Sequence, residues 1–364
     1  MEIGIIGLPK SGKTTLFHAL THGRAETPSH GAQEPHIGVV KVPDPRLDAL
    51  TAIFQPHRTV PADVTYVDIA VPPQGFSSGD RSGRQSLLQV AKADALIHVV
   101  RAFPDPRVPH PEGSVDPERD LATMELELAF ADMELLERRI QRLKESLKAA
   151  KPHEREAGQR EQALLEEIMN KLEAEVPIRA QSLSPEQRHA LENYQLLTQK
   201  PLLVLLNIGE EQLTQAEQMA EGIRQKYPWP QTEVMALSAQ LELELSQMAP
   251  QEAQEFRQAL GATQTSLDQV IRKSFFLLGL ITFFTYASQE VKAWTIRRGL
   301  TAPQAAGKVH SDMERGFIRA EVISYDDLLK SGSLAEARKH GLLRLEGKNY
   351  IVQDGDVITF LFNV

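Results

Sequence analysis

Residues 7–14 read Gly-Leu-Pro-Lys-Ser-Gly-Lys-Thr, which fits the spacing G-x-x-x-x-G-K-[ST] of a phosphate-binding loop. An apolar run precedes this loop and a helical pattern follows it, as such a loop requires. The glycines let successive backbone N–H groups point at phosphate oxygens, and Lys13 adds a positive charge. We therefore expect a nucleotide phosphate site, with Lys13 also acting in catalysis, made by Pro9, Lys10, Ser11, Gly12, Lys13, Thr14 and Thr15.

Two oxygen-bearing side chains predict a cation site beside this loop. The Thr14 hydroxyl follows the loop lysine, and Asp68 ends the apolar run 64–67. In P-loop enzymes a hydroxyl at this position and an aspartate after a buried strand hold Mg²⁺. An aspartate at a strand end is also a common turn former, but its distance from the loop favours the metal role. We expect Mg²⁺ at Thr14 and Asp68.

Two later loops follow apolar runs where a nucleotide base would be recognised. The first reads Asn207-Ile208-Gly209-Glu210 and departs at two positions from the guanine-reading pattern N-K-x-D. The longer carboxylate and the loss of the lysine disfavour paired hydrogen bonds to guanine. The second loop begins where P-loop GTPases keep an S-A-x motif. We expect the base to be contacted by Asn207, Ile208, Glu210, Ser238 and Ala239.

The composition excludes several other classes of protein. The 364 residues include 40 Lys and Arg against 49 Asp and Glu, a net charge of −9 that argues against a protein that coats nucleic acid. The absence of cysteine excludes disulfides, cysteine zinc sites and cysteine nucleophiles. The N-terminus lacks the basic segment and cleavage site of a signal peptide. The most apolar stretch, 275–287, is too short to span a bilayer, so we expect a cytoplasmic protein.

The elements that must position these loops alternate along the chain. Apolar runs separated by helical patterns predict a doubly wound, mainly parallel α/β sheet, with strands at 3–6, 39–42, 64–67, 96–100, 202–206 and 234–237. Between about 118 and 177 apolar residues recur every three to five positions, which predicts an inserted helical hairpin. Ser184-Pro185-Glu186-Gln187 fits a capping box that opens a further helix.

The last part of the chain predicts a small α+β domain. We expect one longer helix at 303–313 and strands at 275–284, 291–296, 319–323, 350–352 and 357–362. The expected domains are then residues 1–117 and 197–277 for the P-loop domain, 118–196 for the helical insertion and 278–364 for the C-terminal domain.

Long segments of the chain resemble the YchF/Obg-like ATPases of the Obg branch of P-loop NTPases. The resemblance covers almost the whole chain and rests on the Asn207 and Ser238 loops, the helical insertion and residues 42–50, 314–322 and 346–364. It implies a G domain, a coiled-coil-like helical domain and a C-terminal TGS domain of the β-grasp type. It also implies that ATP is preferred over GTP through the Asn207 loop, and that the partner is the ribosome or ribosomal RNA. We expect a monomer.

Two loops depart from the pattern of this family. The switch II motif D-x-x-G reads here Asp68-Ile69-Ala70-Val71, followed by Pro72, which has no N–H for a γ-phosphate. The switch I sequence Thr-Ile-Glu-Pro-Asn corresponds to residues 32–36, Ala-Gln-Glu-Pro-His, so its threonine is missing, and Thr27 upstream is only a weak candidate to replace it. We therefore expect a divergent member with slow hydrolysis.

The sequence offers two candidates for the residue that positions the attacking water. The usual glutamine is missing after Asp68, and Gln74 is a candidate substitute. The family carries a histidine in the loop after the strand that ends here near Arg101, and His110 stands at the matching place. A histidine in a proline-rich loop is by default only solvated, so His110 has both interpretations.

Three functions fit these observations, and a fourth is disfavoured. The leading hypothesis is a Mg²⁺-dependent ATPase that reports its nucleotide state to the translation machinery. The altered switch loops motivate a nucleotide-gated binding module with little or no turnover, and the P-loop alone also fits an ordinary GTPase. A metabolic kinase is disfavoured because no pattern for a second substrate site is visible and TGS-like domains are interaction modules.

Overall fold

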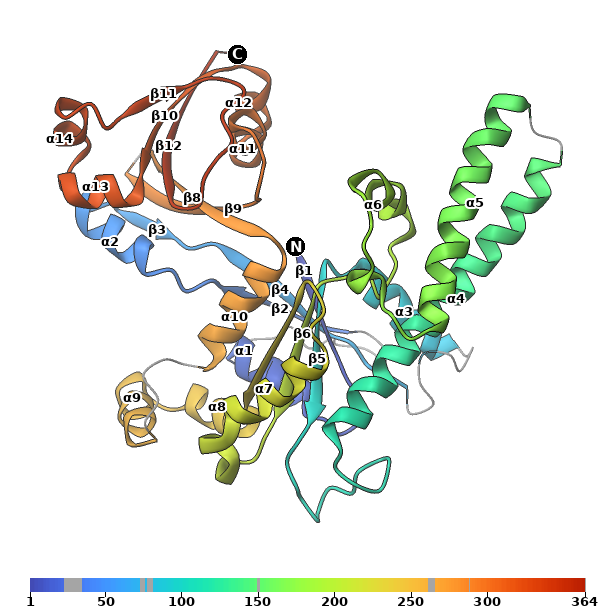
Figure 1. Ribbon diagram of the computed structural model, residues 1–364. Coiled ribbons are helices and arrows are strands. Elements are labelled where there is room, and N and C mark those ends of the chain that lie inside the picture. The colour runs from blue at the N-terminus through green and yellow to red at the C-terminus, as the bar shows by residue number, and fades with distance from the viewer. Residues whose placement is uncertain are drawn as a thin grey trace. The chain divides into compact units, whose positions relative to one another are not determined.

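The computed structural model describes residues 1–22, 35–72, 76, 81–148, 151–260, 266–287 and 289–363 (Figure 1). By their contacts these residues form two compact units. The first comprises Met1–Gly38 and Thr65–Leu267, and the second comprises Val39–Val64 and Asp268–Val364. The segment Val39–Val64, which we expected in the P-loop domain, is therefore grouped with the C-terminal residues. The bounds of the three expected domains remain a prediction.

A mainly parallel sheet is the centre of the first unit. Its strands follow the order β2-β4-β1-β5-β6-β7 and are β1 (Glu2–Ile6), β2 (His36–Lys41), β4 (Asp63–Asp68), β5 (Ala95–Arg101), β6 (Leu202–Asn207) and β7 (Thr232–Leu237). β1 pairs in parallel with β4 and β5, and β6 pairs in parallel with β5 and β7. Every residue of β5 and β6 is buried, as expected for strands covered on both faces. The predicted doubly wound sheet is confirmed.

Helices pack on this sheet through one continuous hydrophobic core. Ile6, Val100 and Leu206 from the strands meet residues of α3 (Arg81–Lys92), the first turns of α4 (Pro117–Leu147) and α7 (Ala216–Lys226). Separately, α1 (Lys13–Thr21) packs against α8 (Ala239–Gln247), which is followed by α9 (Pro250–Ala259). The P-loop therefore lies between a buried strand and a buried helix, which fixes its two ends.

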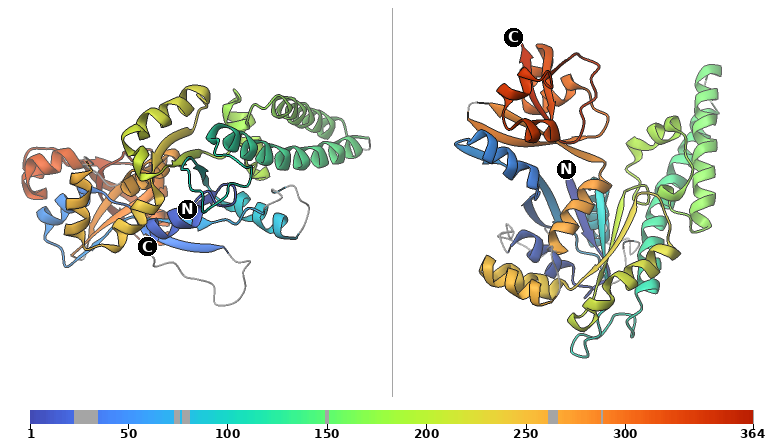
Figure 2. Two further views of the ribbon diagram at one scale, coloured as in Figure 1. Left: turned by 90° about the horizontal axis from the view of Figure 1, so that it is seen from below. Right: turned by 60° about the vertical axis from the view of Figure 1, so that its left-hand side comes forward.

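The helical insertion belongs to the same unit. α4 and α5 (Pro152–Glu173) run side by side as the predicted hairpin and extend away from the sheet (Figures 1 and 2). The predicted capping box is confirmed at α6 (Pro185–Leu191), where Ser184 Oγ accepts from the Gln187 N–H at 3.2 Å and Gln187 Oε1 accepts from the Ser184 N–H at 2.8 Å. Short 3₁₀ turns at Ile178–Ala180 and Glu192–Tyr194 flank α6, and a third at Glu210–Gln215 lies between β6 and α7.

The second unit contains a mixed sheet with the order β11-β10-β12-β8-β9-β3. Its strands are β3 (Arg58–Val60), β8 (Leu280–Ala287), β9 (Glu290–Arg297), β10 (Phe317–Ser324), β11 (Arg344–Glu346) and β12 (Asp356–Phe362). Its helices are α2 (Pro45–Phe54), α11 (Ala302–Val309), α12 (Ser311–Arg315), α13 (Tyr325–Ser331) and α14 (Leu334–Lys339). β3 joins this sheet by pairing in parallel with β9. That pairing explains why residues 39–64 are grouped with the C-terminal part.

Three predictions for this unit are corrected by the structure. The strand expected at 275–284 begins only at Leu280, because 275–277 complete helix α10 (Ser266–Leu277). The chain then turns at Gly279, which has φ +62°. The helix expected at 303–313 is broken by His310, whose extended backbone separates α11 from α12. Residues 350–352 form a single β-bridge from Ile351 to Thr301 rather than a strand.

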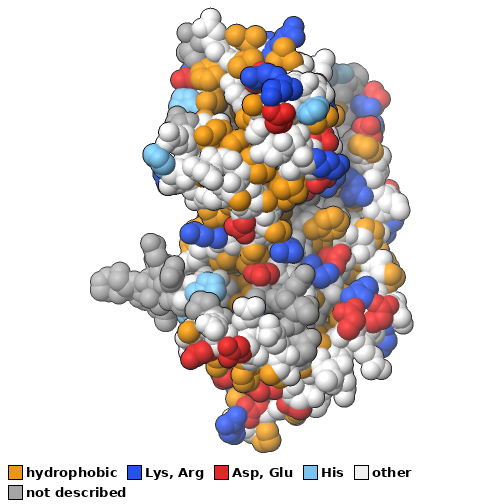
Figure 3. Space-filling model, turned by 90° about the vertical axis from the view of Figure 1, so that its left-hand side faces the viewer, with side chains coloured by type: hydrophobic (Ala, Val, Ile, Leu, Met, Phe, Trp, Pro, Cys, Tyr) orange, Lys and Arg blue, Asp and Glu red, His pale blue; other side chains and the backbone are white. Residues whose placement is uncertain are grey.

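The second unit also exposes apolar side chains. On the face of the molecule drawn in Figure 3, hydrophobic side chains lie exposed among charged ones. Those at least 40% exposed in this unit include Phe276, Ile318, Leu329, Leu345, Ile351, Leu361 and Phe362. Exposed apolar groups interspersed with basic ones are typical of interaction surfaces. None of the helices in the described part of the chain is long and apolar enough to cross a membrane.

A buried carboxylate joins the helical insertion to the sheet. Asp132 of α4 is 2% exposed and accepts hydrogen bonds from the Leu197 N–H (2.7 Å), the Thr198 N–H (2.8 Å) and the Thr198 hydroxyl (2.7 Å). Arg179 adds a bond from its guanidinium to the Thr198 carbonyl at 3.1 Å. Because β6 begins four residues later, this contact fixes how the chain enters the sheet.

Replacing Asp132 by alanine should destabilise the first unit by on the order of 3 kcal/mol, because three donors would lose their buried acceptor. Urea unfolding followed by tryptophan fluorescence in a Trp294→Phe background, which leaves Trp229 of the first unit as the reporter, measures this loss. Glu134→Ala on the same helix removes a side chain that is 67% exposed, so it should change the stability by less than about 0.5 kcal/mol. Equal effects of the two variants would show that the Asp132 contacts do not stabilise the fold.

Candidate nucleotide-binding site

At two positions of the predicted P-loop the backbone conformation and the space around it admit only glycine. A Cβ on Gly7 (φ +150°) would lie 2.3 Å from the Val99 carbonyl oxygen, and a Cβ on Gly12 (φ +96°) would lie 2.2 Å from Asn207 Nδ2. Gly12 also precedes the first residue of α1, and no side chain among the described residues caps this helix. The free N–H groups of the first turn therefore suit an anion such as a phosphate.

The amide of Asn207 ties three loops together. Its Nδ2 donates to the Ser11 carbonyl of the P-loop at 2.9 Å, and its Oδ1 accepts from the Ala239 N–H at 3.0 Å. The Ser238 hydroxyl accepts from the Leu241 N–H at 3.4 Å and caps α8. The phosphate loop and both predicted base loops are thereby held in one place, and Asn207 itself is 5% exposed.

The predicted cation ligands lie in contact. The Thr14 hydroxyl donates to Asp68 Oδ2 at 2.8 Å, and Asp68 is 8% exposed. The buried Ser11 hydroxyl has no hydrogen-bond partner in the described part of the chain, which leaves it available to a phosphate. A hydroxyl and a carboxylate are hard oxygen donors, and Mg²⁺ commonly takes its remaining ligands from phosphates and water. The residues at this corner therefore fit Mg²⁺.

Lys13 is folded over the loop that precedes it. Its Nζ donates to the Gly7 carbonyl at 2.8 Å and to the Leu8 carbonyl at 3.1 Å. Burial lowers the pKa of Lys13 to about 8, against the opposing effect of the Asp68 carboxylate. The ammonium is thus a partly desolvated charge beside the cation corner, where a phosphate would be a strong partner.

A cleft of about 920 Å³ opens beside these groups. Of the predicted site residues it is lined by Lys10, Gly12, Thr15, Asn207, Ile208, Glu210 and Ser238. The Ile208 side chain is 1% exposed and packs in the core, so its backbone is what it can offer to a ligand. Pro9, Ser11, Lys13, Thr14 and Ala239 are not among the lining residues. The sequence missed the contribution of Phe103 to Val108, although the prolines of this loop mark it as irregular.

His110 is held by the start of α4. Its Nε2 lies 2.8 Å from Asp120 Oδ2, and its Nδ1 accepts from the Glu112 N–H at 3.1 Å. The His110 and Asp120 side chains are only 4% and 3% exposed. The neighbouring Pro109 carbonyl accepts from Lys10 Nζ at 3.3 Å, which brings this loop to the P-loop. His110 therefore lies near the site with both ring nitrogens engaged, and it is not a solvated loop residue.

The switch segments are described only in part. Thr27, Gln74 and residues 32–34 lie outside the described residues. Val71 is 8% exposed and packs in the hydrophobic core beside Ile69. A core side chain at the position of the switch II glycine restrains this part of the loop.

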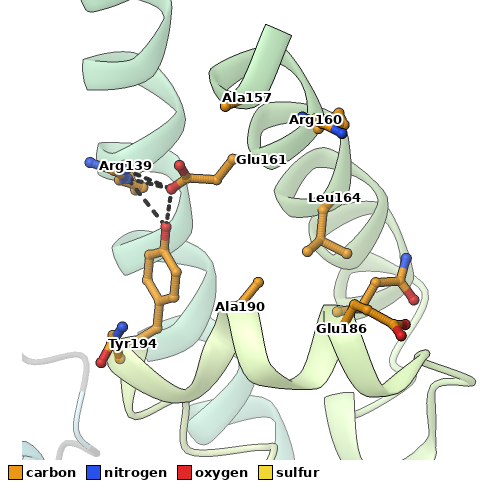
Figure 4. A pocket seen from close by; sticks show the side chains of 10 residues that line it. Arg139, Ala157, Arg160, Glu161, Leu164, Glu186, Ala190 and Tyr194 are labelled. Carbon is orange, nitrogen blue, oxygen red and sulfur yellow. Dashed lines mark hydrogen bonds and ion pairs between the residues drawn. The ribbon is translucent and has the colours of Figure 1, made fainter. Parts of the chain in front are cut away.

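A second cavity, of about 810 Å³, lies in the helical insertion (Figure 4). Arg139 forms an ion pair with Glu161 at 2.7 Å, and the Tyr194 hydroxyl donates to the same carboxylate. Arg160 lies 3.9 Å from Glu156. Its basic side chains thus have acidic partners within the insertion, whereas the cleft beside Lys13 has the features that suit phosphates.

The lowered pKa of Lys13 predicts how nucleotide affinity depends on pH. Above pH 8 the free site loses the proton on Lys13, whereas bound phosphates favour the charged amine. Affinity should therefore begin to fall near pH 8 and approach a tenfold loss per pH unit above about pH 9, with net proton uptake on binding. Calorimetry in two buffers of different ionisation enthalpy measures both. Lys13→Arg stays charged and should remove this slope, while a flat profile in the unaltered protein would contradict the assignment.

Known families match both parts of the chain. Residues 2–137 match the family described as 50S ribosome-binding GTPase, and residues 280–363 match YchF-GTPase_C, described as a protein of unknown function. The chain is 43% identical to the ribosome-binding ATPase YchF of Bacillus subtilis over 100% of both chains. It is 40% identical to the Escherichia coli O157:H7 protein of that name, over 100% of this chain and 99% of that one.

A solved structure agrees with these sequence matches. The Schizosaccharomyces pombe YchF GTPase superposes with a TM-score of 0.87 at 32% identity, covering 99% of this chain and 97% of that one. The agreement in sequence and fold extends over the P-loop, the insertion and the C-terminal part alike. The chain is a member of the YchF family of P-loop NTPases.

Proposed function

We propose that this protein is a Mg²⁺-dependent ATPase that prefers ATP to GTP and binds ribosomes in the cytoplasm. The observation that carries the proposal is the Asn207 bridge, which joins the P-loop and the base loops beside Lys13, Thr14 and Asp68. The names of the bacterial relatives, ribosome-binding ATPases aligned over the full chain, support the substrate and the partner.

Each group at the P-loop would have a separate role in phosphoryl transfer. The free N–H groups at the start of α1 bind phosphate oxygens, and Lys13 neutralises charge on the β- and γ-phosphates. Thr14 and Asp68 hold Mg²⁺, which, when bound, supplies further neutralisation of the phosphate charge. Because these groups are fixed by the fold before the substrate arrives, they stabilise the developing charge without reorganising.

The base loop supports a preference for adenine. Ile208 occupies the position of the GTPase lysine and is buried in the core, so that position offers no cation to a base. Glu210 lines the cleft from the start of a 3₁₀ turn, one methylene longer than the aspartate that reads guanine. Both features weaken the geometry that a GTPase uses. The fission yeast relative is named a GTPase, which makes GTP the alternative substrate.

The altered switch loop supports slow hydrolysis in which His110 positions the attacking water. Val71 is restrained in the core and Pro72 has no N–H to follow the γ-phosphate. His110 lies one residue from the Pro109 contact with Lys10. The ring must leave Asp120 before it can reach the phosphates, so hydrolysis would require a rearrangement at the start of α4.

Equilibrium binding with Mg²⁺ should give a higher affinity for ATP than for GTP, because of the base loop. Multiple-turnover phosphate release should fall at least a hundredfold in Lys13→Ala, which removes the charge beside the phosphates. Lys148→Ala removes an exposed lysine beyond the end of α4 and should leave the rate unchanged. A higher affinity for GTP than for ATP would contradict the adenine preference and favour a GTPase. An unchanged rate of phosphate release in Lys13→Ala would contradict the catalytic role of Lys13.

Replacing His110 by alanine should lower the single-turnover rate of ATP hydrolysis about a hundredfold while the Kd for ATP stays the same. His110→Gln keeps a donor towards Asp120 and controls for loss of that pair. His189→Ala removes a histidine whose side chain is 83% exposed and should change neither quantity. If His110→Ala hydrolyses ATP at the original rate, this histidine only stabilises the start of α4.

A further inference from the structure

A histidine lies beside the cation corner. His36, the first residue of β2, has its Nδ1 3.8 Å from Asp68 Oδ2, the same oxygen that accepts from the Thr14 hydroxyl at 2.8 Å. The His36 side chain is 33% exposed and the Asp68 side chain is 8% exposed. An imidazole nitrogen thus accompanies the two oxygen donors that fit a cation.

The His36 ring is held by the helix that carries Thr14. Its centroid lies 6.1 Å from the Phe17 ring and 6.3 Å from the His18 ring, with interplanar angles of 31° and 35°. Phe17 is fully buried on α1. The imidazole is therefore placed relative to Thr14 by packing as well as by its strand. The corresponding residue in the family's switch I pattern is asparagine, which has no such nitrogen.

We propose that His36 is a direct ligand of the nucleotide-bound cation and shifts its selectivity from Mg²⁺ towards Mn²⁺ and Co²⁺. This inference rests on the proposed cation site at Thr14 and Asp68. Mg²⁺ prefers oxygen ligands, whereas imidazole raises the affinity for first-row transition metals. Neighbouring ligands on an octahedral ion lie about 3 Å apart, so the ring needs to move by less than about 1 Å towards Asp68.

Bound nucleotide must complete this site. Among the described residues, no group of three or more His, Cys, Asp or Glu side chains could hold a metal ion alone. His36, Asp68 and Thr14 supply at most three positions of an octahedron, and the remaining positions fall to phosphate oxygens and water. Metal selectivity should therefore be visible in the complex with ADP and weak without it.

The test uses Mn²⁺ as the probe on the full chain with ADP. Loss of the free Mn²⁺ signal in electron paramagnetic resonance gives the Mn²⁺ affinity, and competition gives the Mg²⁺ affinity. His36→Asn, which restores the residue of the family pattern, should lower the ratio of Mn²⁺ to Mg²⁺ affinity about tenfold. Spin-echo modulation from a directly bound imidazole ¹⁴N should be present in the unaltered protein and absent in His36→Asn.

Two further variants separate the possible failures. His18→Asn should keep both the ¹⁴N modulation and the affinity ratio. If either is lost in this variant, the metal-bound nitrogen belongs to His18 and the assignment to His36 is wrong. Asp68→Asn should weaken both metals. If Asp68→Asn weakens them while His36→Asn leaves the ratio and the modulation unchanged, the cation site stands and the role of His36 is refuted. If Asp68→Asn has no effect, the cation site of the proposed function is itself wrong.

Discussion

The two hydrogen bonds of the Asn207 amide are the contact on which the nucleotide site depends. One side-chain group satisfies the Ser11 carbonyl and the Ala239 N–H at once, at 2.9 and 3.0 Å. The packing around it is so close that a Cβ on Gly12 would overlap its nitrogen. A buried amide with both ends bonded is rigid, because breaking either bond leaves an unsatisfied polar group. The curvature of the P-loop and the start of α8 are therefore fixed together.

Strand β6 links this contact to the helical insertion. Asn207 ends the strand, and Thr198, four residues before it begins, is held by Asp132 of α4. All six residues of β6 are buried between β5 and β7. The hairpin and the nucleotide loops are thus positioned by the two ends of one strand that cannot shift without disturbing the core. A partner that moved α4 would act on the same strand that carries Asn207, and also on Asp120, which holds His110.

Much of the site could be predicted because its signals are local. The P-loop spacing places Lys13 and Thr14 at the start of a helix regardless of what surrounds them, and the six strands of the first sheet follow from short apolar runs. The errors occurred where tertiary packing decides between local options. Residues 275–277 are as apolar as the strand after them, yet they complete α10 because its buried face repeats every three to four residues. Likewise β3, three residues long, pairs with β9 more than two hundred residues later.

The sequence alone determined the chemistry available to this protein: a phosphate loop, a hydroxyl and an aspartate suited to Mg²⁺, and an asparagine loop unlike that of the GTPases. These follow from residue type and short spacing, which do not depend on distant contacts. Only the tertiary structure decided how the groups meet. In the structure Asn207 donates a hydrogen bond to the P-loop from 196 residues away, and the Ile208 side chain is buried in the core. Both ring nitrogens of His110 have partners, and His36 lies beside Asp68. Such contacts depend on sheet order and packing, because residues far apart in sequence become neighbours only when the strands between them have found their places.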